Sequence, residues 1–218
     1  MLLPEIISNM PQYSFSSFVI RPPERGRPTV FSKIPVSIYF GSGNTLLAVM
    51  KLFLHARRNR KEIFHVFNIG PLFLLTLRMA GVRKLVYSIH GTRYWDNWRQ
   101  RVWRKALWRM AMHRRYLLTS NSAFSGMVFR QEVLPVNEIT VLYNPIDNKR
   151  FAPWPDVNKL PQFRRIIYCG RLDRGKNLDS WIRVAIGLKK SFPAVTFRIY
   201  GEGSESTHLD SLIKEEGA

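Results

Sequence analysis

The stretch YCGRLDRGKNLDSWIRVA, Tyr168–Ala185, joins a β-rich run to a helical pattern through a charged loop that contains two glycines. The preceding run, RRIIYC at 164–169, has the apolar, β-branched composition of a buried strand. After the loop, apolar residues recur at helical spacing at Leu178, Trp181, Ile182, Ala185 and Leu188. This order of strand, glycine loop and helix predicts one βα unit of a parallel sheet.

The same alternation extends through the rest of the chain. Strands are predicted at 16–20, 35–40, 62–68, 83–90, 115–120, 138–144, 164–169 and 195–200. Helical patterns occur near 44–58, 71–80, 94–113, 121–131, 177–191 and 204–216. Such alternation predicts an α/β fold, in which a parallel sheet carries helices on both faces.

One proline-rich segment interrupts this pattern and indicates a domain boundary. Residues 144–163 contain four prolines and show no clean period. We therefore predict a first domain at 1–145, a linker at 146–163 and the beginning of a second domain at 164–218. The second domain has only two predicted strands and two helices.

The charge is strongly basic and unevenly distributed. The chain of 218 residues has a formal net charge of +19, and residues 51–115 alone carry 16 basic and 2 acidic residues. A local excess of this kind indicates an anionic partner, which leaves nucleic acid, anionic lipid headgroups and phosphorylated substrates open.

Several classes of protein are disfavoured. Cys169 is the only cysteine, so a disulfide framework within the chain is excluded. The His and acidic residues lack metal-ligand spacing, so we predict no intrinsic metal site and no cofactor. The first 15 residues do not resemble a signal peptide, and the longest apolar run, IGPLFLLTL at 69–77, is interrupted by Arg78 and is too short to span a membrane. These features predict a soluble or peripheral membrane protein.

The loop after the strand at 164–169 is a candidate anion site. In a parallel sheet, ligands bind beyond the carboxyl ends of the strands, and Gly170, Arg171 and Lys176 lie there. Asn177 is a suitable N-cap for the following helix. Two cations at a helix N-terminus are unfavourable without an anion, and a diphosphate would answer that need. A solvated turn with loosely placed charges is the alternative.

Two other strand ends carry candidate residues. Gly201, Glu202 and Gly203 follow the strand at 195–200, where the glycines would let a ligand approach the backbone, although an ordinary βα turn also explains them. His90 ends the strand at 83–90 and could orient a hydroxyl, transfer a proton, bind phosphate or serve as a structural histidine. His65 lies inside a strand, which favours a structural role. No Gly-x-Gly-x-x-Gly or Walker pattern occurs, which disfavours dinucleotide dehydrogenases and P-loop enzymes.

Residues 93–116 form a basic, tryptophan-rich segment. On a helix, Trp95, Trp98, Val102, Ala106 and Met110 make one stripe, with Trp103 and Leu107 beside it. The cations are Arg99, Arg101, Arg104, Lys105 and Arg109, among others. Such a helix fits an anionic membrane surface. An ordinary core-facing helix with a solvated basic face is the alternative and is slightly favoured, whereas a nucleic-acid surface lacks a supporting motif.

Three motifs in order resemble the GT-B glycosyltransferases of family 4. They are VLYNPIDNKRFAP at 141–153, YCGRLDRGKNLDSWIRVA at 168–185 and FPAVTFRIYGEGSE at 192–205. Upstream, IFHVFNIGP at 63–71 and KLVYSIHG at 84–91 resemble the paired strand ends of that family's acceptor domain. The resemblance spans roughly residues 60–218.

The resemblance implies two Rossmann-like domains that face a cleft. It implies transfer of a sugar from a nucleotide-diphosphate donor to a glycan or lipid-linked acceptor, with retention of configuration and no required metal. Arg171 and Lys176 match the pair that holds the donor diphosphate, and His90 matches a histidine near the reacting sugar. Gly201 and Gly203 match a loop close to the nucleotide. We expect a role in cell-surface polysaccharide synthesis, in the cytoplasm or at the cytoplasmic membrane face.

The sequence also departs from the family pattern. No two glutamates are separated by seven residues, Pro145 stands where glycine is usual, and the N-terminal glycine-rich loop is missing. We therefore expect a chain truncated at both ends, with impaired transfer. The alternative is a non-catalytic remnant that binds a membrane or another anion through its basic surface.

Overall fold

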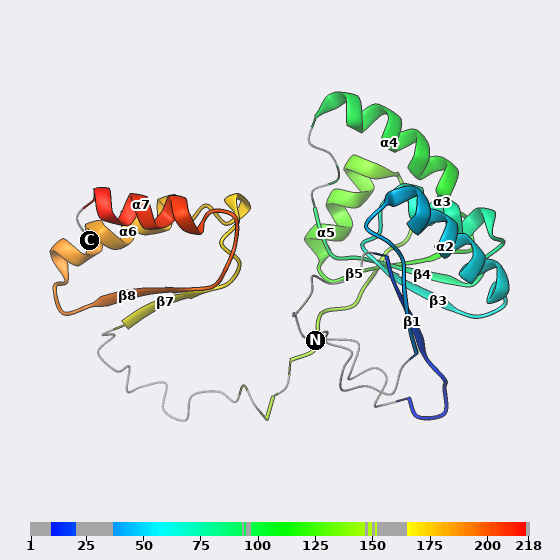
Figure 1. The fold of residues 1–218 in the computed structure, drawn as a ribbon, viewed down its shortest axis with the longest axis horizontal. Helices are drawn as coiled ribbons and strands as arrows, with labels where there is room; N and C mark the ends of the chain where they lie inside the picture. The colour runs from blue at the N-terminus through cyan, green and yellow to red at the C-terminus, as the bar shows by residue number, and fades with distance from the viewer. Residues whose placement is uncertain are drawn as a thin grey trace. The chain divides into compact units, whose positions relative to one another are not determined.

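The computed structural model describes residues 10–20, 37–92, 94, 97–146, 148–149, 151 and 165–216, without the side chains of 37–40. It divides into two compact units, residues 1–147 and 148–218 (Figure 1). Most of the predicted linker at 146–163 lies outside the described residues.

Unit 1 is built on parallel strands. One pair joins β1 (Ser16–Val19) and β2 (Ser37–Phe40). A four-stranded sheet follows in the order β3 (Phe64–Phe67), β4 (Leu85–Ile89), β5 (Leu117–Ser120) and β6 (Thr140–Val141). The register pairs Phe64 with Leu85 and Val86 with Leu117. Every strand of this sheet was predicted, although β6 is much shorter than 138–144.

The described helices of unit 1 pack on one face of this sheet (Figure 1). They are α2 (Thr45–Arg58), α3 (Pro71–Met79), α4 (Trp98–Ala111) and α5 (Ala123–Val128), which continues into the π-helix η2 (Phe129–Val133). Within the described residues, the expectation of helices on both faces is not met. The reason is the strand order, because right-handed crossovers between successive neighbouring strands all place their helices on the same side.

The core of unit 1 is centred on an aromatic group. Tyr87 of β4, Trp108 of α4 and Phe129 of η2 are at most 2% exposed. The Trp108 ring meets both other rings edge-on, with centroids 5.4 Å apart in each case. Leu85, Tyr87 and Ile89 alternate along β4 and point into this core.

Helix α4 differs from its prediction in which stripe it buries. Trp98, Val102 and Met110 of the predicted stripe are 70%, 65% and 56% exposed, whereas Trp108 and Ala111 face the core. The core-facing interpretation of the predicted stripe is therefore wrong. The buried stripe was missed because it also contains Arg104, whose Nη1 donates to the Tyr94 carbonyl at 2.6 Å while its Nε is buried without a hydrogen-bond partner among the described residues.

Unit 2 pairs β7 (Arg165–Cys169) with β8 (Thr196–Tyr200) in parallel. The turn η3 (Arg174–Lys176) leads into α6 (Leu178–Ser191), and α7 (Ser206–Glu215) follows β8. Leu178 and Ile182 of α6 pack with Leu209 and Leu212 of α7 in a small core. Within the described residues, no helix is both long and apolar enough to cross a membrane.

Candidate functional site

The loop after β7 lies at the carboxyl end of the sheet in unit 2, as its sequence position predicts. Arg171 is 80% exposed in its side chain, and its Nη2 lies 3.0 Å from Oδ2 of Asp173. The Lys176 amide donates to the Asp173 carbonyl at 2.8 Å, and this bond closes the turn that carries Lys176. Arg171 and exposed Lys176 therefore flank one short turn, and Arg174 adds a third cation to it.

The loop after β8 packs directly on this first loop. The Gly170 amide donates to the Tyr200 carbonyl at 3.0 Å, and the Leu172 amide donates to the Glu202 carbonyl at 2.9 Å. A side chain at Gly201 would overlap the Gly170 carbonyl oxygen, and one at Gly203 would overlap the Leu172 backbone. The space beside these glycines is therefore filled by the backbone of the loop after β7 and not by a ligand. This packing brings together two loops that lie thirty residues apart in the sequence.

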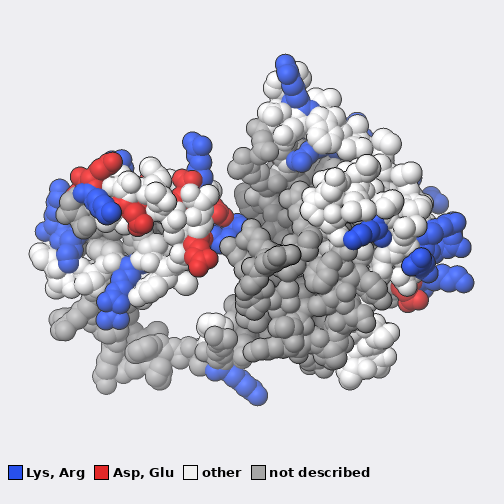
Figure 2. Space-filling view, viewed as in Figure 1, with Lys and Arg blue, Asp and Glu red and all other residues white. Residues whose placement is uncertain are grey.

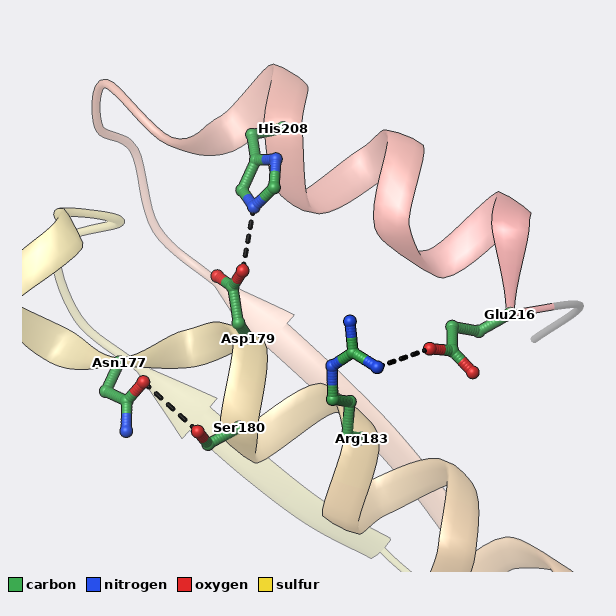
Figure 3. Close-up of polar contacts among 6 residues, drawn as sticks. All are labelled: Asn177, Asp179, Ser180, Arg183, His208 and Glu216. Atoms are coloured by element: carbon green, nitrogen blue, oxygen red, sulfur yellow. Dashed lines mark hydrogen bonds and ion pairs between the residues drawn. The ribbon is translucent and has the colours of Figure 1, made fainter.

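Asn177 occupies the N-cap position of α6 but does not cap the helix. Its backbone is left-handed, with φ 51° and ψ 45°, and its side chain makes no hydrogen bond to the helix backbone. Instead, the Ser180 hydroxyl donates to Asn177 Oδ1 at 3.1 Å (Figure 3). The predicted capping role of Asn177 is wrong, because a left-handed N-cap turns its side chain away from the first helical amides.

The electrostatics of this turn favour an anionic ligand. Asp173 is the single acidic side chain that the described structure pairs with Arg171, and the Arg171 side of that pair is open to solvent. Exposed ion pairs contribute little, so a doubly charged anion can compete for the Arg171 guanidinium. Asp173 and Arg174 were not selected from the sequence, because a charge in a loop does not indicate its partner.

Two polar contacts join α6 to α7 (Figure 3). His208 Nε2 lies 2.8 Å from Asp179 Oδ2, and Arg183 Nη1 lies 3.1 Å from Glu216 Oε1. The bond to His208 is the main cause that lowers the pKa of Asp179 below 3.8. The same bond raises the pKa of His208 above 6.5. Nothing in the sequence connects these residues, which lie 29 positions apart.

We expect the Asp179–His208 pair to make the stability of the chain depend on pH. The contribution of His208 is complete below pH 6.5 and is lost as the pH rises through the raised pKa. The contribution of Asp179 is complete above pH 3.8 and is lost as the pH falls through the lowered pKa. Between pH 3.8 and pH 6.5, both contributions to stability are therefore complete.

Urea unfolding of the wild type and of His208→Gln at pH 5.5 and 8.5 measures this effect. The stability advantage of the wild type should be larger at pH 5.5. The difference in the free energy of unfolding between the two proteins cancels the contributions of the other histidines. Arg183→Ala is the control, because it removes the neighbouring Arg183–Glu216 ion pair, which contains no histidine, and its effect should be equal at both pH values. An advantage independent of pH would contradict the pairing.

His90 lies in unit 1 at the carboxyl end of β4, as predicted. Its partly buried ring meets the Phe67 ring edge-on at 5.5 Å. Burial lowers the pKa of His90, so the imidazole is neutral at pH 7 and can accept or donate a hydrogen bond. Asn68 follows the neighbouring strand with a positive φ of 49°, and its side chain lies beside Gly91.

His65 belongs to a hydrogen-bonded row across the sheet. Its Nε2 lies 2.7 Å from the Ser88 hydroxyl, which lies 2.7 Å from the Thr119 hydroxyl. Ser88 and Thr119 are buried. These contacts link β3, β4 and β5 and agree with a structural role for His65.

The candidate membrane residues of α4 divide into two groups. Trp98 and Trp103 are 70% and 50% exposed, and the Arg99 and Arg104 guanidinium groups lie over their rings at 5.5 and 5.4 Å. Arg99 and Arg109 are exposed, and Lys105 is partly buried. Arg101 instead pairs with Glu132 of η2 at 3.2 Å, and Arg104 bonds the Tyr94 carbonyl. Trp95 lies outside the described residues.

Comparison with known proteins decides the family. Residues 15–150, more than half of the chain, match the family model described as Glycosyltransferase Family 4. The chain belongs to glycosyltransferase family 4. Comparison with curated protein sequences gives no match.

One solved structure is similar to this chain in fold. The crystal structure of a Staphylococcus aureus (S. aureus) TarM mutant, in complex with Fondaparinux, alpha-GlcNAc-glycerol and UDP, is similar with a TM-score of 0.53 and 16% sequence identity. The likeness covers 78% of this family 4 chain and 34% of TarM, so the chain spans about a third of the length of TarM. The fold is therefore of the α/β GT-B type.

The structural likeness extends past the family match. Residues 15–150 make up less than two-thirds of the chain, whereas the likeness to TarM covers 78%. Only 14 residues precede the family match, so part of the likeness falls after residue 150. Among the described residues, no group of three or more His, Cys, Asp or Glu side chains is placed to hold a metal ion.

Proposed function

We propose that this family 4 chain transfers a sugar from a nucleoside-diphosphate donor to a glycan or lipid-linked acceptor, with retention of configuration. The observation that supports this most is the paired loop of unit 2, where Arg171 and Lys176 flank a turn at the carboxyl ends of β7 and β8. TarM, which shares the fold, was crystallised with UDP.

In this proposal, the two cations bind the diphosphate in different ways. The Arg171 guanidinium exchanges Asp173 for two phosphate oxygens, and the Lys176 ammonium acts as a point charge. Both stabilise the negative charge that develops on the leaving diphosphate, so no metal is needed for that step. Gly170, Gly201, Glu202 and Gly203 hold the loop that presents these cations.

On the acceptor side, we assign His90 as the catalytic candidate of unit 1. A neutral imidazole next to the Phe67 ring can hold a sugar hydroxyl through one ring nitrogen. The proposed role is to orient a hydroxyl near the reacting carbon.

We further propose that the reaction serves cell-surface polysaccharide synthesis at the cytoplasmic membrane face. The supporting feature is the outer stripe of α4, where Trp98, Val102, Trp103 and Met110 are each at least 50% exposed. Tryptophan rings prefer the headgroup level of a bilayer, and the exposed Arg99 and Arg109 suit anionic lipid phosphates. Neither the core nor another described helix covers this stripe.

Calorimetric titration of UDP and GDP into the 218-residue chain tests the donor site. Arg171→Ala/Lys176→Ala should weaken binding at least about tenfold, because two charge-assisted contacts are lost. Arg198→Ala removes a cation from β8 outside both loops and should leave binding unchanged. Unchanged affinity in the double variant, or an equal loss in Arg198→Ala, would reject the donor-site assignment.

A transfer assay decides between catalysis and the non-catalytic alternative. The wild-type chain is incubated with a panel of nucleotide sugars and a lipid-linked acceptor. Turnover that His90→Ala abolishes supports the proposed role of His90. Nucleotide binding without turnover identifies a binding protein instead.

A further inference from the structure

A basic hollow lies at the edge of unit 1 opposite to His90. Its lining is Arg57, Arg60, Lys61, Gly81, Arg83 and Lys84, which includes five cations and no acidic side chain. Figure 2 shows Lys and Arg side chains gathered on this side of the unit. Glu62 lies next to Lys61 in the sequence but does not line the hollow.

The hollow is separate from the carboxyl edge of the sheet. Lys84 precedes the first residue of β4, whereas His90 follows the last. Five strand residues span about 17 Å, so the two places lie at opposite ends of the strand. Because ligands of parallel α/β sheets bind at the carboxyl ends, the acceptor and donor proposals do not account for the hollow.

Backbone hydrogen bonds hold the two turns that carry the cations. In the turn after α2, the Glu62 amide donates to the Asn59 carbonyl at 2.9 Å. In the turn after α3, the Val82 amide donates to the Leu77 carbonyl at 3.1 Å, and the Phe64 amide donates to the Lys84 carbonyl at 2.9 Å. These bonds hold the bases of both cation-bearing turns, so a ligand meets partly preorganised charges.

Gly81 brings the two turns close together. Its φ of +88° is left-handed, and a side chain there would meet Arg57 Nη1 at 3.5 Å and Arg60 Cδ at 3.6 Å. The arginine side chains of the first turn therefore lie against the backbone of the second. The charges converge from two segments that are separated by more than twenty residues.

The crowding of positive charge extends beyond the hollow. The pKa of His113 is lowered, first by burial and then by the positive charges of four arginines, which are Arg78, Arg115, Arg114 and Arg83. α2 ends at Arg58 and α3 ends at Met79, so the negative ends of both helix dipoles lie beside the hollow and offset part of this repulsion. An anion with several charges would relieve this repulsion.

We propose that this hollow is a second anion site, which binds a phosphate-bearing ligand. The guanidinium groups of Arg57, Arg60 and Arg83 can each form two parallel hydrogen bonds to phosphate oxygens, and Lys61 and Lys84 add point charges. Two sources supply this chemistry, a soluble polyphosphate group and the headgroups of anionic lipids.

The first arm of the test titrates inorganic tripolyphosphate into the 218-residue chain and follows backbone amides by NMR. The Gly81 signal should shift and saturate. Arg60→Ala/Arg83→Ala should raise the apparent Kd at least about tenfold, as expected when charged hydrogen bonds are lost. Arg60→Lys/Arg83→Lys keeps the charge and should bind with intermediate affinity. The Gly170 signal reports the donor loop separately, so failure of the proposed donor site can be distinguished from failure of the second anion site.

The second arm measures co-sedimentation with phosphatidylglycerol vesicles and with phosphatidylcholine vesicles. If lipid headgroups are the source, Arg60→Ala/Arg83→Ala lowers the pelleted fraction on phosphatidylglycerol, and tripolyphosphate does not saturate the Gly81 signal. Lys190→Ala/Lys214→Ala removes the same charge from unit 2 and should change neither arm. An effect of the hollow variants in either arm supports the site. No binding in both arms, or equal weakening by the unit 2 pair, overturns it.

Discussion

Gly201→Ala should destabilise the packing of the two loops of unit 2 by about 3 kcal/mol or more. The φ of Gly201 is +154°, which L-residues rarely adopt, and the new methyl group would overlap the Gly170 carbonyl oxygen. Backbone atoms cannot move aside as a flexible side chain can. The loop that carries Arg171 must therefore separate from the loop after β8.

Hydrogen exchange at two amides measures this separation. The Leu172 amide donates to the Glu202 carbonyl, and the Glu205 amide donates to the Leu172 carbonyl, so both should lose protection in Gly201→Ala. Gly187→Ala is the matched control, because nothing lies within 4 Å of its added methyl group in α6. That change should stabilise the helix by up to about 1 kcal/mol. Equal protection in both variants would show that the loops do not depend on this contact.

Trp108→Ala should destabilise unit 1 by about 3 to 5 kcal/mol, as is typical when a large aromatic side chain is removed from a core. The indole is 2% exposed and meets the rings of Tyr87 and Phe129 edge-on. Its removal leaves a cavity between β4, α4 and η2. Urea unfolding, with hydrogen exchange of the β4 amides as the local probe, measures the loss.

The same helix supplies matched controls. Trp98 and Trp103 are 70% and 50% exposed, so Trp98→Ala and Trp103→Ala should each change stability by no more than about 0.5 kcal/mol. Together they should reduce co-sedimentation with anionic vesicles, which Trp108→Ala in its folded state should not. A large stability loss from Trp98→Ala would mean that the outer stripe is packed. Unchanged vesicle binding would reject the membrane proposal.

The sequence predicted the element types well, because local patterns encode them. Alternating apolar residues at 83–90 and 195–200 predicted β4 and β8, and the spacing of Leu178, Ile182 and Ala185 predicted α6. Errors came where one polar residue carried two possible roles. Asn177 is a residue type that commonly caps helices, but it adopts a left-handed backbone. Arg104 lies in the buried stripe of α4, so that stripe did not look apolar in the sequence.

The sequence by itself determined which residues could meet a ligand at the carboxyl ends of the strands. Arg171, Lys176 and His90 follow predicted strands, and the direction of a parallel strand places its following loop at one edge. The tertiary structure alone decided which distant segments meet. The packing of Gly201 on Gly170, the Asp179–His208 pair and the basic hollow depend on strand order and crossover hand. A local sequence pattern specifies neither the strand order nor the crossover hand, because contacts between distant residues form only when the sheet assembles.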